Sequence, residues 1–344
     1  PIAVLTAIGY STIMTMKQKE NCRPVDSSSI PRFAGIKTFM RLPHERIVSG
    51  SDFAVMGLPF DTGSTYRIGA RFGPEAVRRI SVLIKPYNAH HKIDIFDYIS
   101  GVDYGDLNVL PGYILDTYET VAEEMKLFTD NSVVPVVIGG DHSVTLPQLR
   151  ALCKKHGPVA LVHFDAHLDT ADSYFGKKYT HGTPFSRACD EGLLIPEKTI
   201  QIGMRGTYYG EHSMEESTGR GFTVISADEA LDMGLDRVIE LIHKKVGTSK
   251  VFVTFDVDAC DPAYAPGTGT IIPGGFTSRE ALKLIRGLDG LHFIGFDVVE
   301  VLPDLDPSDI TSCLASNIVF EYLTLIALRK KKNPHTRLLV KKTN

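Results

Sequence analysis

Residues 159–169 have the sequence Val-Ala-Leu-Val-His-Phe-Asp-Ala-His-Leu-Asp, an apolar run that ends in three metal-ligand types at alternate positions. The apolar part, residues 159–164, predicts a buried strand. Side chains two residues apart in an extended segment share a face, so Asp165, His167 and Asp169 can turn into one pocket. The stretch therefore predicts a metal-binding site at the end of a buried strand.

The same arrangement occurs at two other places in the chain. Val251–Phe255 runs into Asp256 and Asp258, and Val134–Ile138 runs into Gly139-Gly140-Asp141-His142. The carboxyl ends of parallel strands lie at one edge of a sheet, where open α/β sheets bind their ligands. We therefore expect six metal ligands to converge there: His142, Asp165, His167, Asp169, Asp256 and Asp258. Asp141, next to one of them, is expected to support the site.

Strand-like and helix-like segments alternate from residue 52 onward. We predict strands over 53–58, 133–138, 159–164, 199–203, 251–255 and 292–299, and helices from 73 and over 116–128, 143–155, 235–246, 279–287 and 309–328. Strands joined through helices imply right-handed crossovers and parallel pairing. The predicted fold class is α/β, a three-layer α/β/α sandwich with a mostly parallel central sheet. We divide the chain into an N-terminal arm (1–50), one catalytic domain (51–330) and a basic C-terminal tail (331–344).

Composition restricts the partners. A formal net charge of −4 over 344 residues favours neither nucleic acid nor an anionic membrane. No apolar run appears long enough to span a bilayer, and residues 1–14 lack the basic start of a signal peptide. The five cysteines have no CxxC spacing, which fits a reducing compartment. We expect a cytoplasmic protein, with a mitochondrial location as the alternative.

The ligand types indicate the metal and the chemistry. Two histidines with four carboxylates suit Mn²⁺, with Ni²⁺, Co²⁺, Fe²⁺ and Zn²⁺ as alternatives. Without a cation, the four carboxylates would repel one another and lose their hydration. Two ions about 3.5–4 Å apart can share a water and lower its pKa towards neutrality. This predicts hydrolysis at an electrophilic carbon; phosphorus is disfavoured because the pocket motifs contain no phosphate-binding cluster.

The motifs together resemble those of the ureohydrolase (arginase/agmatinase) family over about residues 40–328. The matching segments are Gly69–Pro74, Gly139–Ser143, Phe164–Asp169, His181–Phe185, Phe255–Asp258, Asp261–Thr270 and Val299–Ser308. The resemblance implies an arginase-like fold, a dinuclear Mn-type centre and hydrolysis of a guanidino group to urea and an amine. It also implies roles: Asp169 bridges the metals and relays a proton, His181 is the acid or proton shuttle, Glu300 holds the guanidinium, and Thr270 adds a hydrogen bond.

Substrate choice is predicted from the segments around these motifs. Arginases carry an Asn just after the Asp-Ala-His-x-Asp motif, whereas this chain has Thr170–Tyr174 there. Ile84–Asn88 looks like a run in guanidinobutyrase- and guanidinopropionase-like members, so Asn88, Asp172 and Tyr174 are substrate-contact candidates. The expected substrates are 4-guanidinobutanoate, agmatine or free guanidine. Relatives usually have Pro after Thr270, and Ile271-Ile272 here would favour a small substrate if they face inward.

Two alternatives stay open. One is metal-dependent hydrolysis of another C–N bond, as in formiminoglutamate or an amide; Glu300 argues against it, because a carboxylate suits a cationic guanidinium better. The other is a non-catalytic binding relative, which retention of all six ligands and His181 disfavours. The resemblance also implies a homotrimer or homohexamer.

Overall fold

The computed structural model describes residues 22–332, apart from the side chains of residues 211 and 212. Its centre is a parallel eight-stranded sheet with the strand order β4-β1-β5-β10-β9-β6-β7-β8. The strands are β1 (Phe53–Gly57), β4 (Gly101–Asp106), β5 (Val134–Ile138), β6 (Val159–Phe164), β7 (Leu194–Met204), β8 (Thr223–Ser226), β9 (Lys250–Asp256) and β10 (His292–Val299). The predicted α/β fold with a mostly parallel sheet is confirmed.

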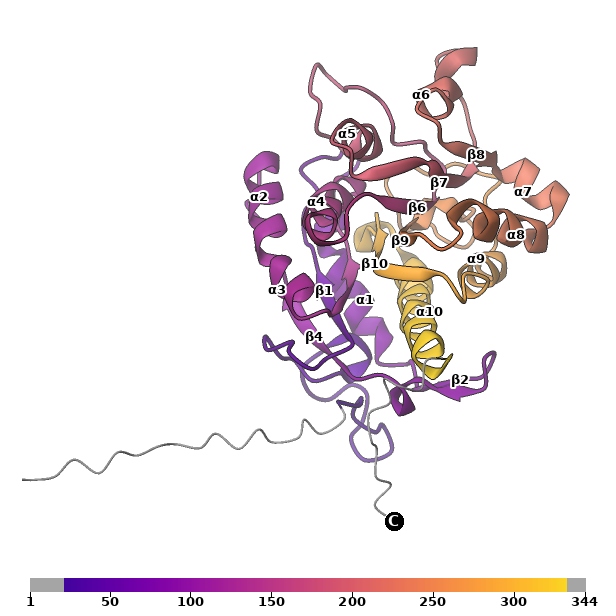
Figure 1. Cartoon of the computed structure of the whole chain (residues 1–344). Coiled ribbons are helices and arrows are strands. Elements are labelled where there is room, and N and C mark those ends of the chain that lie inside the picture. Colours follow the sequence, from indigo (N-terminus) through magenta and orange to yellow (C-terminus); the bar gives the residue numbers. More distant parts are fainter. Residues whose placement is uncertain (1–21, 333–344) are drawn as a thin grey trace, which may run out of the picture.

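Helices cover both faces of this sheet, which makes the three predicted layers (Figure 1). One layer contains α1 (Gly73–Ser81), α10 (Ile310–Lys332), α9 (Ser278–Arg286), α8 (Leu235–Val246) and α7 (Ala227–Met233), each packed on the next. The other contains α2 (Ile114–Glu124), α3 (Lys126–Asp130), α4 (Thr145–His156) and α5 (Pro184–Asp190). The short helix α6 (Glu215–Thr218) and the hairpin of β2 (Tyr87–Asn88) and β3 (Ile93–Asp94) lie outside the central sheet.

The four strands that lead into the predicted site are neighbours, β5, β10, β9 and β6. Phe164 of β6 pairs with Phe255 of β9, so the aspartates that follow them start at the same level. These strands are buried along nearly their whole length, as expected for a sheet covered on both faces. The fold thus brings segments more than a hundred residues apart to one edge.

Two strands of the central sheet, β4 and β8, were not predicted, for different reasons. β4 carries Asp103, which interrupts the apolar pattern but is buried against Arg78, with Nε 2.9 Å from its Oδ2. β8 has only four residues. The predicted helix over 116–128 is also wrong as one element, because α2 and α3 are separated at Met125.

The N-terminal arm is shorter than predicted. Phe39, Met40, Leu42 and Val48 are buried, and the Phe39 N–H donates to Asp103 Oδ2 at 2.7 Å. Residues 39–48 therefore belong to the packed domain, and the prediction of an arm over 1–50 is wrong for this part. Residues 1–21 of the arm and most of the 331–344 tail lie outside the described residues.

The prediction that no run is long enough to span a membrane is wrong. Among the described residues, the helical stretch Pro307–Lys332, which contains α10, is long and apolar enough to cross a bilayer. However, 83% of its apolar window is buried against the rest of the protein, so α10 is a core helix.

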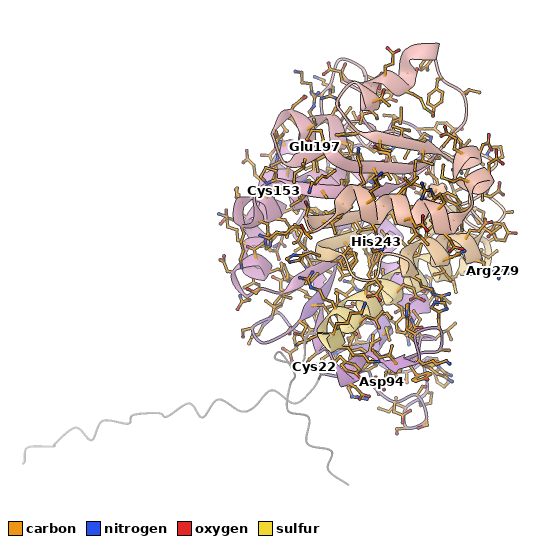
Figure 2. All side chains as sticks on the ribbon, turned by 45° about the vertical axis from the view of Figure 1, so that its right-hand side comes forward. Cys22, Asp94, Cys153, Glu197, His243 and Arg279 are labelled. Carbon is orange, nitrogen blue, oxygen red and sulfur yellow. The ribbon has the colours of Figure 1, made fainter. Side chains whose placement is uncertain are left out.

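All five cysteines are free thiols, in agreement with the absence of paired spacings. Figure 2 shows Cys22 and Cys153 in well-separated parts of the molecule.

Candidate metal centre and substrate pocket

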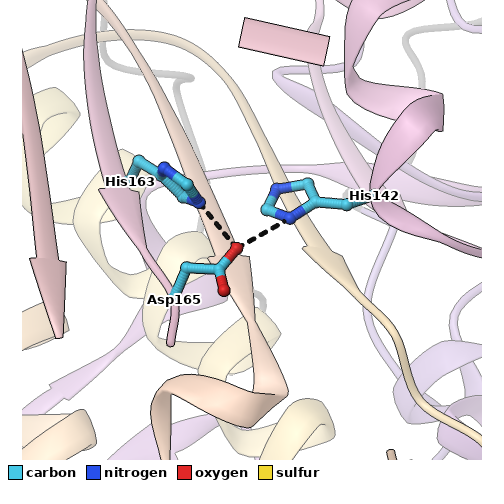
Figure 3. A group of neighbouring side chains, drawn as sticks. All are labelled: His142, His163 and Asp165. Atoms are coloured by element: carbon cyan, nitrogen blue, oxygen red, sulfur yellow. Dashed lines mark hydrogen bonds and ion pairs between the residues drawn. The ribbon is translucent and has the colours of Figure 1, made fainter. Parts of the chain in front are cut away.

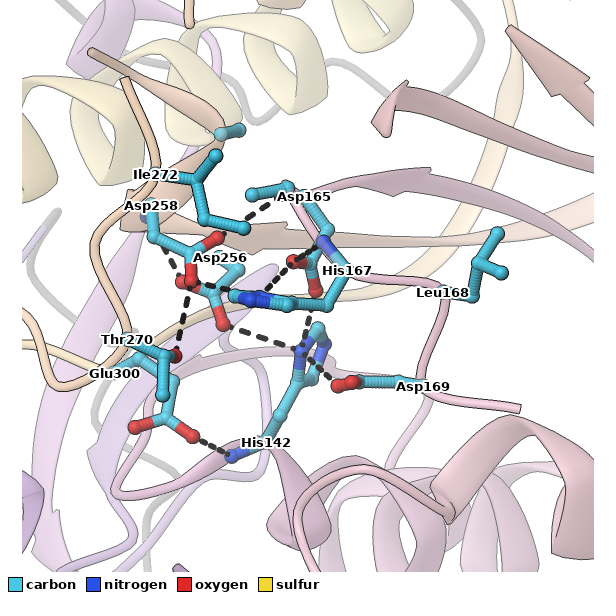
Figure 4. Close-up of polar contacts among 12 residues, drawn as sticks. His142, Asp165, His167, Leu168, Asp169, Asp256, Asp258, Thr270, Ile272 and Glu300 are labelled. Atoms are coloured by element: carbon cyan, nitrogen blue, oxygen red, sulfur yellow. Dashed lines mark hydrogen bonds and ion pairs between the residues drawn. The ribbon is translucent and has the colours of Figure 1, made fainter. Parts of the chain in front are cut away.

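The six predicted ligands converge at the carboxyl edge of the sheet (Figure 4). His142 follows β5 and begins a short 3-10 turn, Asp256 ends β9, and Asp165 directly follows β6. A side chain on Gly140, two residues before His142, would collide with the Phe60 backbone, so only glycine fits at this close approach.

His142 is the centre of the first group of ligand atoms. Its Nδ1 lies 3.0 Å from Asp165 Oδ2, 3.0 Å from Asp169 Oδ2 and 3.3 Å from Asp256 Oδ2. The side chain of His142 is only 1% exposed, yet Nδ1 has no hydrogen-bond partner. A buried nitrogen that lies within ion-pair distance of three carboxylates but forms no hydrogen bond is suited to bind a metal ion.

His167 forms the second group, with Nδ1 3.0 Å from Asp258 Oδ2 and 3.4 Å from Asp165 Oδ1. The two oxygens of Asp165 therefore face different histidines, and this carboxylate links both groups. The arrangement fits two neighbouring cation positions rather than one.

The charge balance also favours cations. Burial is the main reason why the pKa of the Asp258 carboxyl is raised to about 6. Burial and the charges of Asp258 and Asp165 raise the pKa of Asp256 well above its ordinary value. Burial and repulsion between the carboxylates thus disfavour the charged form of Asp256 and Asp258, and bound divalent cations would reverse that preference. The residues fit the metal pair that the ligand types predict.

Buried polar residues orient the ligand side chains. His142 Nε2 lies 2.9 Å from Thr254 Oγ1, and His163 Nε2 lies 2.7 Å from Asp165 Oδ2 (Figure 3). His163 Nδ1 lies 2.9 Å from Gln201 Nε2, so protein groups occupy both nitrogens of that ring. We assign His163 to positioning Asp165 rather than to binding metal. His163 is not among the predicted site residues, although its place two residues before Asp165 puts it on the same strand face.

His181 and Glu300 form a pair beside the ligands. His181 Nδ1 lies 2.9 Å from Glu300 Oε1, and its Nε2 lies 2.8 Å from Thr65 Oγ1. Glu300 Oε1 also accepts from the His142 N–H at 2.9 Å. Burial lowers the pKa of His181, but the hydrogen bond and charge of Glu300 outweigh it and raise the pKa to about 9. The pair with Glu300 therefore favours the protonated form of His181.

The backbone is unusual at two of these positions. Asp169 has φ +52° and Glu300 has φ +63°, in the left-handed region that non-glycine residues seldom adopt. Such conformations cost about 1–3 kcal/mol and cluster at functional sites, which supports a role for both residues.

A pocket of about 290 Å³ opens onto this centre. Thr270 and Tyr174, two of the predicted substrate contacts, line it together with Asp169, His181 and Glu300. Thr270 Oγ1 also lies 3.4 Å from Asp258 Oδ2, so it can support a ligand as well as a substrate.

Two predicted substrate contacts are not brought to the pocket. Asn88 is buried in the β2–β3 hairpin, where Nδ2 donates to Glu321 Oε2 at 2.9 Å, on the inner side of α10. Asp172 is 72% exposed and pairs with Arg187 Nη2 at 2.9 Å. Both predictions are corrected: Asn88 joins the hairpin to a core helix, and Asp172 belongs to a surface ion pair. Asp141 is buried and accepts the Ser143 N–H at 3.0 Å, consistent with its expected supporting role.

The comparisons with known proteins agree with this site. The model of the family described as "Arginase family" matches residues 51–324. The chain is 41% identical to guanidinobutyrase of Pseudomonas aeruginosa, with 88% of this chain and 96% of the relative covered. It is 41% identical to the mitochondrial agmatinase of Gallus gallus, with 88% and 89% covered.

A solved structure extends the likeness to three dimensions. Proclavaminate amidino hydrolase from Streptomyces clavuligerus superposes with a TM-score of 0.84 at 44% identity, covering 87% of this chain and 99% of that one. The family match over residues 51–324 includes the central sheet and all the segments that carry the candidate site. The chain therefore belongs to the arginase family and is an amidinohydrolase of the ureohydrolase type.

Proposed function

We propose that this protein hydrolyses the guanidino group of a small guanidino compound, releasing urea together with an amine or ammonia. The observation that carries the proposal is the convergence of six ligand side chains, His181 and Glu300 around one pocket. Three substrates are candidates: 4-guanidinobutanoate, agmatine and free guanidine. The names of the guanidinobutyrase and agmatinase relatives support this class of substrate.

The centre would hold two divalent cations, most simply Mn²⁺, with Ni²⁺ as the alternative. The ligands would be His142, Asp165, His167, Asp169, Asp256 and Asp258. Two such cations supply Lewis acidity and an activated water at neutral pH.

The protein's own residues bind the substrate and move the protons. Glu300, 4% exposed and held by the His142 N–H, offers a fixed carboxylate to the guanidinium. Asp169 accepts the proton of the attacking water and passes it to the leaving nitrogen. His181 acts as the acid or proton shuttle, because Glu300 keeps it protonated at neutral pH.

Glu300 also favours this function over hydrolysis of another C–N bond. The contacts of Glu300 with His181 and with the His142 N–H both use Oε1, and a guanidinium matches the carboxylate in charge and geometry better than a neutral amide does. The non-catalytic alternative is disfavoured, because a pocket that only binds a ligand needs neither a protonated His181 beside Glu300 nor a strained backbone at Asp169 and Glu300.

The test is urea release by Mn²⁺-loaded protein from guanidine, 4-guanidinobutanoate, 3-guanidinopropanoate, agmatine and arginine. We expect urea from at least one of the first four and little from arginine. The matched control is the Asp169→Asn variant, loaded with metal in the same way. Absence of urea from all five compounds would refute the proposal. The predicted homotrimer or homohexamer stays a prediction, which light scattering of the same sample checks.

A further inference from the structure

The loop after Thr270 contains two adjacent isoleucines, of which only one has its side chain in the pocket. Ile272 lines the pocket, whereas Ile271 is 46% exposed and does not. Ile272 packs on Gly206: a Cβ built on this glycine would lie 2.8 Å from Ile272 Cδ1. Figure 4 shows Ile272 beside the ligand Asp258. One wall next to the metal centre is therefore apolar and held in place by close packing.

Arg205 lines the same pocket but has its guanidinium occupied. Its Nη2 donates to the carbonyl oxygens of Ile272 and Asp258, both at 2.7 Å, and of Cys260 at 3.1 Å. Its Nε and Nη1 also donate to backbone carbonyls. Arg205 thus ties the Ile272 loop to the turn of Asp258, and none of its three nitrogens is left for a substrate carboxylate.

Among the described side chains that line the pocket, only Arg205, His167 and His181 can carry positive charge. The lining also includes Tyr174, Tyr208, Tyr209 and the exposed Glu216. The remaining lining side chains that can carry positive charge, His167 and His181, contact Asp258 and Glu300. A carboxylate beside Ile272 would lose hydration and gain no free cationic partner among the described lining side chains, and Glu216 adds negative charge to the same pocket.

We propose that Ile272 is a specificity-determining residue: it makes the enzyme favour guanidino compounds whose remaining part is small or uncharged, and disfavour those that carry a carboxylate. This inference rests on the proposed guanidino hydrolysis and adds the class of tail that the pocket accepts. It places guanidine ahead of 4-guanidinobutanoate among the candidate substrates.

The test compares 4-guanidinobutanoate with its neutral isostere 4-guanidinobutanamide on the Mn²⁺-loaded full-length protein. The wild-type protein should show a kcat/KM for the amide that is about tenfold higher than for the acid. This factor corresponds to the loss of one weak hydrogen bond to a charged group, because the carboxylate finds no partner in the pocket. Ile272→Lys should move the acid/amide ratio towards the acid by at least about tenfold, because it supplies the missing charge.

Ile271→Lys is the matched control, since it adds the same charge one residue away on an exposed position. It should change the ratio by less than about twofold, as expected for an exposed charge. Ile272→Ala, which keeps the wall uncharged and removes only bulk, should leave the ratio unchanged while raising kcat/KM for butylguanidine. It also tests the inference if the lysine variant does not fold.

The results separate the two proposals. A wild-type preference for 4-guanidinobutanoate, or equal effects of the two lysine substitutions, would overturn the role of Ile272 while leaving guanidino hydrolysis intact. Failure of every guanidino compound to release urea would instead overturn the proposed function itself.

Discussion

Thr254 offers a direct test of how the protein prepares its metal ligands. The hydroxyl of Thr254 lies 2.9 Å from His142 Nε2, and both side chains are fully buried. This contact fixes the ring so that Nδ1 faces Asp165, Asp169 and Asp256. Thr254→Val removes the hydroxyl with little change in shape.

Two effects of Thr254→Val can be separated. Leaving the buried Nε2 without a partner should lower the free energy of unfolding by about 1–3 kcal/mol. Loss of a partner that orients a ligating histidine typically weakens metal binding by about 10–100-fold. We therefore expect Mn²⁺ affinity, measured by isothermal titration calorimetry, to fall within this range, together with the melting temperature.

Thr117→Val is the matched control. Thr117 is 1% exposed and its hydroxyl donates to the Leu110 carbonyl oxygen at 3.1 Å, away from every predicted ligand. It should lower stability to a similar degree and leave Mn²⁺ affinity within about threefold, because the additivity of distant sites predicts no coupling. Equal metal affinities of the two valine variants would refute the view that Thr254 acts through His142.

Three further predictions concern the centre itself. Metal analysis after Mn²⁺ loading and desalting should find about two ions per chain, and one or none would contradict the dinuclear site. Asp169→Asn should reduce urea release by at least about a thousandfold with the fold retained by circular dichroism; substantial residual activity would remove its assigned role. Glu300→Gln should act through His181, whose pKa of about 9 lies above the ordinary 6.5. A raised histidine pKa stabilises the fold fully below pH 6.5, and this stabilisation, on the order of 3 kcal/mol, is lost as the pH rises through about 9. The melting temperatures of wild type and Glu300→Gln should therefore differ more at pH 6 than at pH 10, and a pH-independent difference would argue against the pair.

Much of the site could be predicted because its ligands lie next to strongly apolar strands. Asp165, His167 and Asp256 are recognisable from local pattern alone: a buried strand ends and metal-ligand types follow at alternate positions. Because these strands are buried on both faces, their sequences are nearly continuous apolar runs that are easy to recognise as strands. Parallel pairing then brings their carboxyl ends to one edge of the sheet.

Other features depend on contacts between segments far apart in the chain. Asn88 looked like a substrate contact by resemblance, but the β2–β3 hairpin directs it to Glu321, 233 residues away. Gln201, which holds His163, comes from the neighbouring strand β7 and carries no local mark of that role. β4 was not predicted because it contains the buried charge of Asp103. Arg78 compensates this charge, but it lies in another segment and cannot be recognised from the sequence of the strand.

Local sequence was enough to predict the layered parallel fold, the six candidate ligands and the chemistry they favour, because these depend on strand periodicity and side-chain type. Contacts between distant segments, in contrast, set which of two adjacent isoleucines faces the pocket and whether Arg205 is free to bind a substrate. Gly206 leaves room for Ile272, and the carbonyls of two separate loops occupy the Arg205 guanidinium. The candidate metal ligands can thus be predicted from local sequence, whereas the proposed substrate selectivity depends on packing between loops that are far apart in the chain.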